Sequence, residues 1–122
     1  MKEAEVEDVF AYHLRREGWV VSVEAKHKQD YIDVLAKHPD GTVLIAEVKG
    51  ETKKENAGVD VDVLYGQILR RMKSDHAEGT RYALVVPEML IPALERVDHS
   101  IRAKLNLEVF IVKPTGEVFL SV

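Results

Sequence analysis

The sequence predicts a single α/β domain whose mixed central β-sheet is flanked by helices on both faces. Helical and strand periodicities follow one another in the order helix, strand, strand, strand, helix, strand, helix, strand. A hairpin in the first half of the chain, Tyr31–Lys49, is apolar on both faces, as expected of strands that are covered on each side. The 122 residues are enough for one hydrophobic core and too few for two domains.

The N-terminal segment predicts a helix followed by a strand. Apolar residues recur at helical spacing over Lys2–Glu17, and Gly18 stands where a helix commonly ends in a left-handed residue. Trp19–Glu24 predicts the first strand, and Ala25–Asp30 predicts a basic loop. The residues that we expect to form the buried stripe of this helix are Val6, Val9, Phe10, His13 and Leu14.

The turn sequence His-Pro-Asp-Gly at 38–41 sets the register of the hairpin. Asp-Gly alone would favour a two-residue loop, which would place Asp33 and Glu47 on opposite faces. Pro39 suits the second position of a type I turn, so we expect a three-residue loop with a left-handed Gly41. In that register Asp33 lies opposite Glu47. The residues that alternation then predicts to share the other face are Ile32, Val34, Ala36, Leu44, Ala46 and Val48.

Two carboxylates and a lysine are therefore expected at the end of an apolar hairpin. Directly opposite residues have Cβ atoms about 5 Å apart, and Lys49 would point to the same side as Glu47. An ion pair on a solvated strand end would also account for the Glu-x-Lys spacing. Because both faces of the hairpin are apolar, the carboxylates are instead expected to be buried, where they need a partner or a metal. Oxygen ligands without cysteine or spaced histidines favour Mg²⁺, with Mn²⁺ as a substitute.

The second half of the chain predicts two further helices and three strands. The second helix has an interior glycine, Gly66, which indicates close packing. The expected elements are a polar loop over Gly50–Gly58, a helix over Val59–His76 capped by Asp60 or Asp62, a strand over Arg81–Val86, one helix that starts near Pro92 and buries Leu94, Val97, Ile101 and Leu105, and strands over Leu107–Val112 and Glu117–Val122.

Composition limits the classes of function. The formal net charge is −4, so binding to nucleic acid would depend on a local basic patch. The absence of cysteine excludes disulfides and thiolate metal sites and fits a reducing compartment, so we expect a cytoplasmic protein. The sequence has no apolar run long enough to span a bilayer and no signal peptide, and we expect no membrane association.

The two carboxylates and the lysine of the hairpin resemble the signature of the PD-(D/E)XK nuclease superfamily, whose fold is restriction-endonuclease-like. Asp33 matches its aspartate at the start of the second core strand, and Glu47-Val48-Lys49 matches its Glu-x-Lys on the third. Ile32 stands where the signature has proline. The chain is most similar to archaeal-type Holliday junction resolvases, which carry a catalytic glutamate in the first helix ahead of a Gly-aromatic step. Glu7 precedes Gly18-Trp19 at matching spacing.

The resemblance implies metal-assisted hydrolysis of phosphodiester bonds in DNA, with Glu7, Asp33, Glu47 and Lys49 as the catalytic residues. Asp33, Glu47 and the backbone carbonyl of Val48 would hold Mg²⁺, with Glu7 binding through water or completing a second site. Lys49 would orient or deprotonate the attacking water, or stabilise the developing charge. Of the acidic residues in the first helix, only Glu7 is expected to matter for activity.

We expect branched DNA as the substrate, and a homodimer that pairs through the apolar C-terminal strand. The resolvases that the chain resembles usually have arginine after the helix glutamate and a more basic chain, whereas this one has Asp8 and a negative net charge. Four alternatives stay open: a nonspecific or flap nuclease, a RecB-like nuclease, an inactive nuclease-fold module that binds nucleic acid, and a structural subunit whose acids form an ion network. The residues expected to contact DNA are Lys26, Lys28, Lys53, Lys54, Gln67, Arg70, Arg71 and Lys73.

Overall fold

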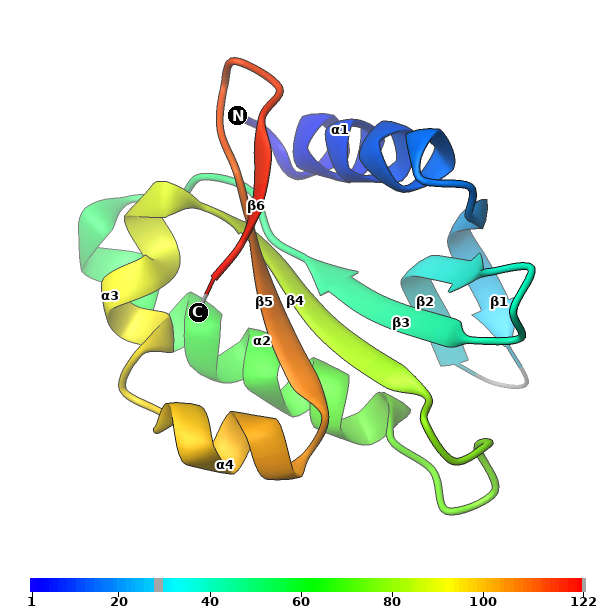
Figure 1. Cartoon of the computed structure of the whole chain (residues 1–122). Coiled ribbons are helices and arrows are strands. Elements are labelled where there is room, and N and C mark those ends of the chain that lie inside the picture. Colours follow the sequence, from blue (N-terminus) through cyan, green and yellow to red (C-terminus); the bar gives the residue numbers. More distant parts are fainter. Residues whose placement is uncertain (28–29, 122) are drawn as a thin grey trace.

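A computed structural model describes the backbone of residues 1–27 and 30–121 and the side chains of residues 1–24 and 31–121. Six strands form one sheet in the order β1-β2-β3-β4-β5-β6 (Figure 1). β1, β2 and β3 pair antiparallel in sequence, β3, β4 and β5 run parallel to one another, and β6 returns antiparallel to β5. The mixed sheet flanked by helices confirms the predicted fold class. Within the described residues, no helix is long and apolar enough to cross a membrane.

The helices and strands follow the predicted order. The helices are α1 (Glu3–Arg16), α2 (Ala57–Arg71), α3 (Ile91–Leu94) and α4 (His99–Lys104), with 3₁₀ turns at Lys54–Asn56 and Glu88–Leu90. The strands are β1 (Val20–His27), β2 (Asp30–Lys37), β3 (Val43–Val48), β4 (Arg81–Pro87), β5 (Leu107–Val112) and β6 (Val118–Leu120).

Each face of the sheet buries its own hydrophobic cluster. On one face α1 packs Val6, Phe10 and Leu14 against the sheet. On the other face α2 and α3 bury Val61, Leu64, Ile68 and Leu94. The central strands β3 and β4 contribute side chains to both clusters, which explains their nearly continuous apolar sequences.

The predicted hairpin register is confirmed. Leu35 pairs with Ile45, as the three-residue loop requires. Gly41 donates its N–H to the carbonyl of His38 at 2.9 Å and has φ +93°, a conformation that glycine adopts without steric cost. Gly18 likewise ends α1 with φ +92°. The conformational preferences of the turn residues thus determine the register of the hairpin.

Alternation fails at one position in the hairpin. Val34 and Ala36 pack under α1 as predicted, whereas Ile32 lies in the cluster on the opposite face. The break falls at Asp33, one residue beyond the end of the β2–β3 ladder at Val34. On β1, Glu24 lies opposite Asp33 and has a left-handed backbone with φ +50°. A regular strand would have kept Ile32 and Val34 on one side.

Several predicted boundaries are wrong. Ala25–His27 continues β1 where we expected a loop, and the other end of that expected loop, Asp30, begins β2. Residues 28 and 29 lie outside the described residues. The helix expected over Val59–His76 begins at Ala57, so Asp60 and Asp62 do not cap it, and it ends before Met72, whose ψ of 121° is extended. The end of the expected last strand, Val122, also lies outside the described residues.

The predicted third helix is two short helices. Its continuity is interrupted at Asp98, whose extended backbone (ψ 138°) precedes α4. As a result Ile101 and Leu105, predicted to be buried, are exposed. The interior glycine of α2 was also misinterpreted, since a Cβ on Gly66 would have no neighbour within 4 Å.

The close approach occurs at Gly50 instead, just after β3. A Cβ at Gly50 would lie 2.4 Å from the backbone nitrogen of Glu3 and 2.8 Å from the carbonyl carbon of Lys2. Met1 reinforces this contact, because its carbonyl accepts the N–H of Glu51 at 2.8 Å and its ammonium group pairs with the Glu51 carboxylate. The first turn of α1 is therefore fixed against the segment that follows β3.

We predict that Gly50→Ala lowers the free energy of unfolding by about 2 kcal/mol, because the added methyl group would collide with backbone that cannot move away cheaply. Gly66→Ala is the matched control. It adds the same methyl group in open space within a helix and should raise stability by about 0.5–1 kcal/mol. Urea unfolding followed by circular dichroism measures both. Equal effects of the two variants would show that the contact at Gly50 is loose.

Candidate active site

Asp33 and Glu47 are joined by two crossed hydrogen bonds at the point where β2 and β3 stop pairing. The regular ladder ends at Val34 and Ala46. Beyond it, the backbone N–H of Asp33 donates to Glu47 Oε2 at 3.0 Å, and the backbone N–H of Val48 donates to Asp33 Oδ2 at 2.8 Å. Here the side-chain carboxylates accept the backbone N–H groups that strand carbonyls would accept in a regular ladder. The two bonds hold both carboxylates in the gap between the strands.

Glu47 is almost fully buried, with 2% of its surface exposed, and pairs with an arginine from α2. Its Oε1 atom lies 3.1 Å from a terminal nitrogen of Arg71. The pKa of Glu47 is raised to about 7, mainly by burial and also by the nearby charge of Asp33, while hydrogen bonds from the Asp33 N–H and Arg71 oppose the rise. The pKa of Asp33 is raised as well, mainly by burial and against the Val48 hydrogen bond.

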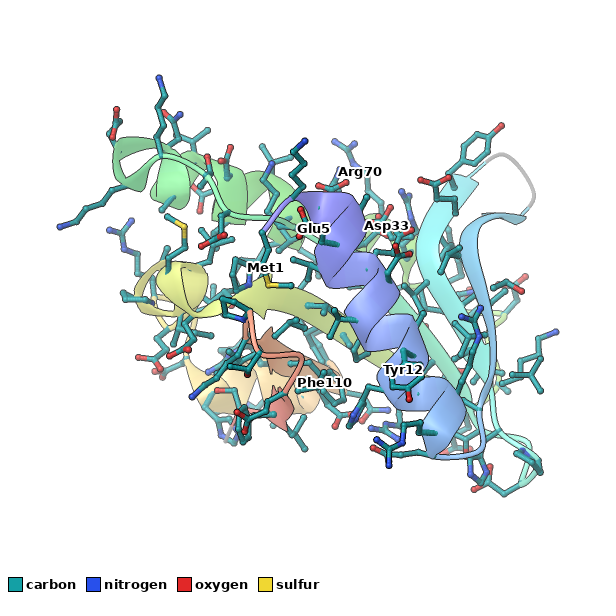
Figure 2. The ribbon with its side chains drawn as sticks, turned by 90° about the horizontal axis from the view of Figure 1, so that it is seen from above. Met1, Glu5, Tyr12, Asp33, Arg70 and Phe110 are labelled. Atoms are coloured by element: carbon teal, nitrogen blue, oxygen red, sulfur yellow. The ribbon has the colours of Figure 1, made fainter. Side chains whose placement is uncertain are left out.

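The N-terminal half of α1 adds two more carboxylates to this cluster. Glu7 is buried, and its pKa is raised to about 7 by burial, then by the charges of Asp33 and Glu24. Burial and the charge of Asp33 also raise the pKa of Glu3. Figure 2 shows the molecule from above, with α1 running across the view, Asp33 beside the N-terminal half of the helix and Arg70 in the same part of the view. Asp33 therefore lies next to Glu47 on β3 and also acts electrostatically on Glu3 and Glu7 of α1.

Lys49 follows the last residue of β3 and is half-buried. Its backbone N–H donates to the carbonyl of Val85 at 3.0 Å, which extends the contact between β3 and β4 by one residue. Its ammonium charge lowers the pKa of Glu3, so the side chain lies near the first turn of α1. Glu47, in contrast, is paired with α2.

Sequence reasoning missed three members of the cluster. Glu24 lies on β1 at the register position facing Asp33, and its charge acts on Asp33, Glu3 and Glu7. Arg71 was predicted only as a DNA contact, and Glu3 was expected not to matter for activity. None of the three has a motif of its own. The positive φ of Glu24, unusual for a glutamate, is visible only in the structure.

The residues predicted to bind DNA are dispersed around the cluster. Lys53 and Lys54 are exposed at the 3₁₀ turn after β3, and Arg70 and Lys73 are exposed at the end of α2. Gln67 is half-buried on α2. Lys28 and the side chain of Lys26 lie outside the described residues.

The donor set fits a hard divalent cation. Within the part of the chain whose side chains are described, no three His, Cys, Asp or Glu side chains form a ready-made metal cluster. Asp33 and Glu47, with the Val48 carbonyl between Glu47 and Lys49, supply only oxygen ligands, and each carboxylate has lone pairs beyond those used by the crossed hydrogen bonds. Five carboxyl groups around two cationic side chains also leave the cluster with excess negative charge.

The fold is shared with two solved structures. An XisH family protein from Nostoc punctiforme superimposes with a TM-score of 0.59 at 17% identity, over 93% of this chain and 95% of that one. A repair endonuclease from Pyrococcus abyssi superimposes with a TM-score of 0.51 at 19% identity, over 93% of this chain and 48% of that one. The chain has their fold. Neither protein-family models nor the sequences of curated proteins match it. At these identities the likeness concerns the fold, and the chain spans about half the length of the repair endonuclease.

We predict that the metal-free protein loses stability as the pH rises from about 4.5 to about 7. The ordinary pKa of a glutamate is 4.5, and those of Glu7 and Glu47 are about 7 in the folded protein. In this interval the folded state binds more protons than the unfolded state, so the free energy of unfolding falls with pH. The contribution is complete below pH 4.5 and lost as the pH passes through 7.

Thermal unfolding between pH 4.5 and 8 in a chelator tests this. The double variant Glu7→Gln/Glu47→Gln should show a flatter pH dependence than the wild type, whereas Glu5→Gln should not differ from it. A wild-type Tm that rose with pH over this interval would contradict the pKa assignment.

Proposed function

We propose that the chain is a metal-dependent endonuclease that hydrolyses phosphodiester bonds in DNA. The observation that carries this proposal is the pairing of half-buried Asp33 with buried Glu47, held by crossed backbone hydrogen bonds in a gap of the sheet. Burying two carboxylates side by side is costly, and a structural role would be served better by apolar residues. The shared fold with a protein described as a repair endonuclease supports the same class of reaction.

Asp33, Glu47 and the carbonyl of Val48 are the residues that would hold Mg²⁺ or Mn²⁺. A bound cation supplies Lewis-acid stabilisation of the phosphate and lowers the pKa of bound water. Arg71 keeps the Glu47 carboxylate oriented through its 3.1 Å contact. Glu7, whose pKa is about 7, can accept a proton from water and release it at neutral pH. Lys49 provides a cation near Glu3 that can stabilise negative charge on the phosphate.

We propose a branched DNA as the substrate, with the Holliday junction as the leading candidate. This rests on the similarity of Glu7, Asp33 and the Glu47–Lys49 segment to archaeal-type resolvases. Flap and single-stranded DNA are the alternative substrates, and a panel of such DNAs separates them. The exposed Lys53, Lys54, Arg70 and Lys73 are our candidates for contacts with phosphates.

We predict that Asp33→Asn and Glu47→Gln each lower Mg²⁺-dependent cleavage by a factor of about 10³ or more, because each removes a charged oxygen ligand while keeping the side-chain shape. Binding of a branched DNA, measured by fluorescence anisotropy, should stay within a few-fold of the wild type. Asp62→Gln, on the exposed side of α2, is the control and should cleave normally.

Metal binding provides a second readout. Mn²⁺ should raise the Tm of the wild type and not that of Asp33→Asn. An ion network without metal affinity would show no such rise in the wild type, and an inactive binding module would bind DNA without cleaving it under any metal. Near wild-type cleavage by either carboxylate variant would overturn the site assignment.

We predict that Glu7→Gln lowers the cleavage rate by a factor of about 10², because general acid–base groups contribute on this scale. Glu5 is the matched control on the same helix. Its carboxylate accepts the backbone N–H of Lys2 at 3.3 Å, an interaction that glutamine preserves, so Glu5→Gln should have little effect. Glu3→Gln is expected to fall between them, since Glu3 lies near Lys49. Equal rates for all three variants would show that α1 contributes only structure.

We also propose that the protein acts as a two-fold dimer. β6 is an edge strand of only three residues, and Phe119 and Leu120 on it are exposed. An exposed apolar edge favours pairing with a second copy, and closed two-fold symmetry is the commonest result. Two sites in one complex would also allow two matched nicks at a junction.

We predict that sedimentation at micromolar concentration shows a dimer and that Leu120→Lys converts it to a monomer. Val59→Lys, at a more exposed apolar position on α2, is the control and should leave the dimer intact. A monomeric wild type that still made paired nicks would refute the dimer. A dimer that survived Leu120→Lys would refute only the interface.

A further inference from the structure

Arg102 on α4 is a buried arginine that has no anionic partner among the residues whose side chains are described. Only 7% of its surface is exposed, and its buried Nε–H group donates no hydrogen bond within the described residues. Among the ion pairs of the part of the chain that the structure describes, none includes Arg102. Taking an unpaired guanidinium out of water costs several kcal/mol, so such a group needs an explanation.

The polar groups around Arg102 do not neutralise it. Tyr65 is close enough for Arg102 to lower its pKa, but burial outweighs this and raises the pKa above 10. Tyr65 is therefore neutral, and its hydroxyl donates to the carbonyl of Leu94 at 2.7 Å. The carboxylate of Glu108, on β5 nearby, is already paired with Arg81.

Arg102 lines a cavity of about 320 Å³ between α4, the first half of β5 and the end of β6. His99, Asn106 and Ser121 also line the cavity, and their side chains carry hydrogen-bond donors, although the Asn106 amide already donates to the Thr80 carbonyl at 2.8 Å. Leu107, Val109 and Leu120 supply an apolar wall. The volume holds a tetrahedral oxyanion with several waters, each of which takes up about 30 Å³ in the liquid.

We propose that this cavity binds a phosphate group, with the Arg102 guanidinium as its principal ligand. A planar guanidinium bonds two oxygens of a phosphate at once, and hydroxyl and imidazole donors complete the coordination of such an anion. Glu108 lies on the same wall, but its pairing with Arg81 reduces its repulsion of a bound anion. A phosphate bound in this cavity would supply the countercharge that Arg102 lacks among the described residues.

The phosphate site is separate from the candidate active site. Its residues belong to α4, β5 and the end of β6, whereas the carboxylate cluster lies on α1, α2 and the first three strands. The proposal does not depend on nuclease activity, and its test uses no cleavage assay. The phosphate could be free inorganic phosphate or the 5′-phosphate of a nucleotide, and the experiment distinguishes the two.

Thermal unfolding of the full chain is measured in a buffer without oxyanions, with inorganic phosphate added and ionic strength held constant with NaCl. Phosphate should raise the wild-type Tm with the logarithm of its concentration above its Kd, by about 5 °C at a tenfold excess over its Kd. Deoxyadenosine 5′-monophosphate and deoxyadenosine are compared in the same way. A larger shift with the nucleotide than with phosphate assigns the site to a nucleotide 5′-phosphate, and an equal or smaller shift assigns it to free phosphate.

Arg102→Met separates this role from a purely structural one. Because it removes an uncompensated buried charge, it should unfold at the wild-type Tm or above it without phosphate, and it should lose the phosphate-dependent shift. Lys104→Met, an exposed cation on the same helix, should keep the full shift. Ser121→Ala, which removes only a hydroxyl, should weaken phosphate binding several-fold and serves as the test if Arg102→Met does not fold.

Two results would overturn the proposal. One is a wild-type Tm that responds to phosphate no more than to NaCl. The other is a phosphate shift that persists unchanged in Arg102→Met, or in Ser121→Ala if Arg102→Met does not fold.

Discussion

The crossed hydrogen bonds between Asp33 and the Glu47-Val48 segment are the interaction on which the candidate active site depends. Two like charges about 4 Å apart repel by about 4 kcal/mol at an effective dielectric constant of 20. Hydrogen bonds from a backbone N–H to a charged acceptor contribute about 1.5–3 kcal/mol each, so two of them offset repulsion on this scale. They also replace the strand ladder at the point where it ends. The same two bonds therefore satisfy the backbone and position the carboxylates.

The docking of α1 brings the remaining acids to this pair. Because Gly50 has no side chain, the backbone of the first helical turn can approach the segment that follows β3. Val6 and Phe10 then bury against the sheet, and this burial fixes Glu7, which lies between them on the same helix. The hydrophobic contacts of α1 thus hold a carboxylate in a place that electrostatics disfavours, as its pKa of about 7 shows.

The site gathers residues from elements that are separate in the sequence and lie on different faces of the sheet. α1 contributes Glu3 and Glu7 from one face, and α2 contributes Arg71 from the other. The gap between β2 and β3 is where the charges from both faces meet, because Asp33 interacts with each of them. A cluster with raised carboxyl pKa values in such a gap stores unfavourable charge that a bound cation would relieve. The hydrophobic clusters on the two faces of the sheet stabilise the fold, and polar groups occupy the gap between β2 and β3.

The sequence by itself determined the features that depend on a few neighbouring residues. Pro39 and Gly41 specified the hairpin register, and that register placed Asp33 opposite Glu47 before any tertiary contact was known. Gly18 ended the first helix by the same kind of local rule. The order of apolar periodicities was sufficient for the mixed sheet and its two helical layers, because burial requires each pattern to face a partner.

Only the tertiary structure decided which groups surround the carboxylates. Arg71 is 24 positions from Glu47 along the chain, and its pairing depends on how α2 crosses the sheet. Glu24 joins the cluster through strand pairing and a left-handed backbone that no sequence pattern indicates for glutamate. The interruption at Asp98 and the displaced Ile32 were equally unpredictable. The physical reason is that turn and periodicity rules act within a few residues, whereas charge interactions and packing depend on distances that only the assembled fold defines.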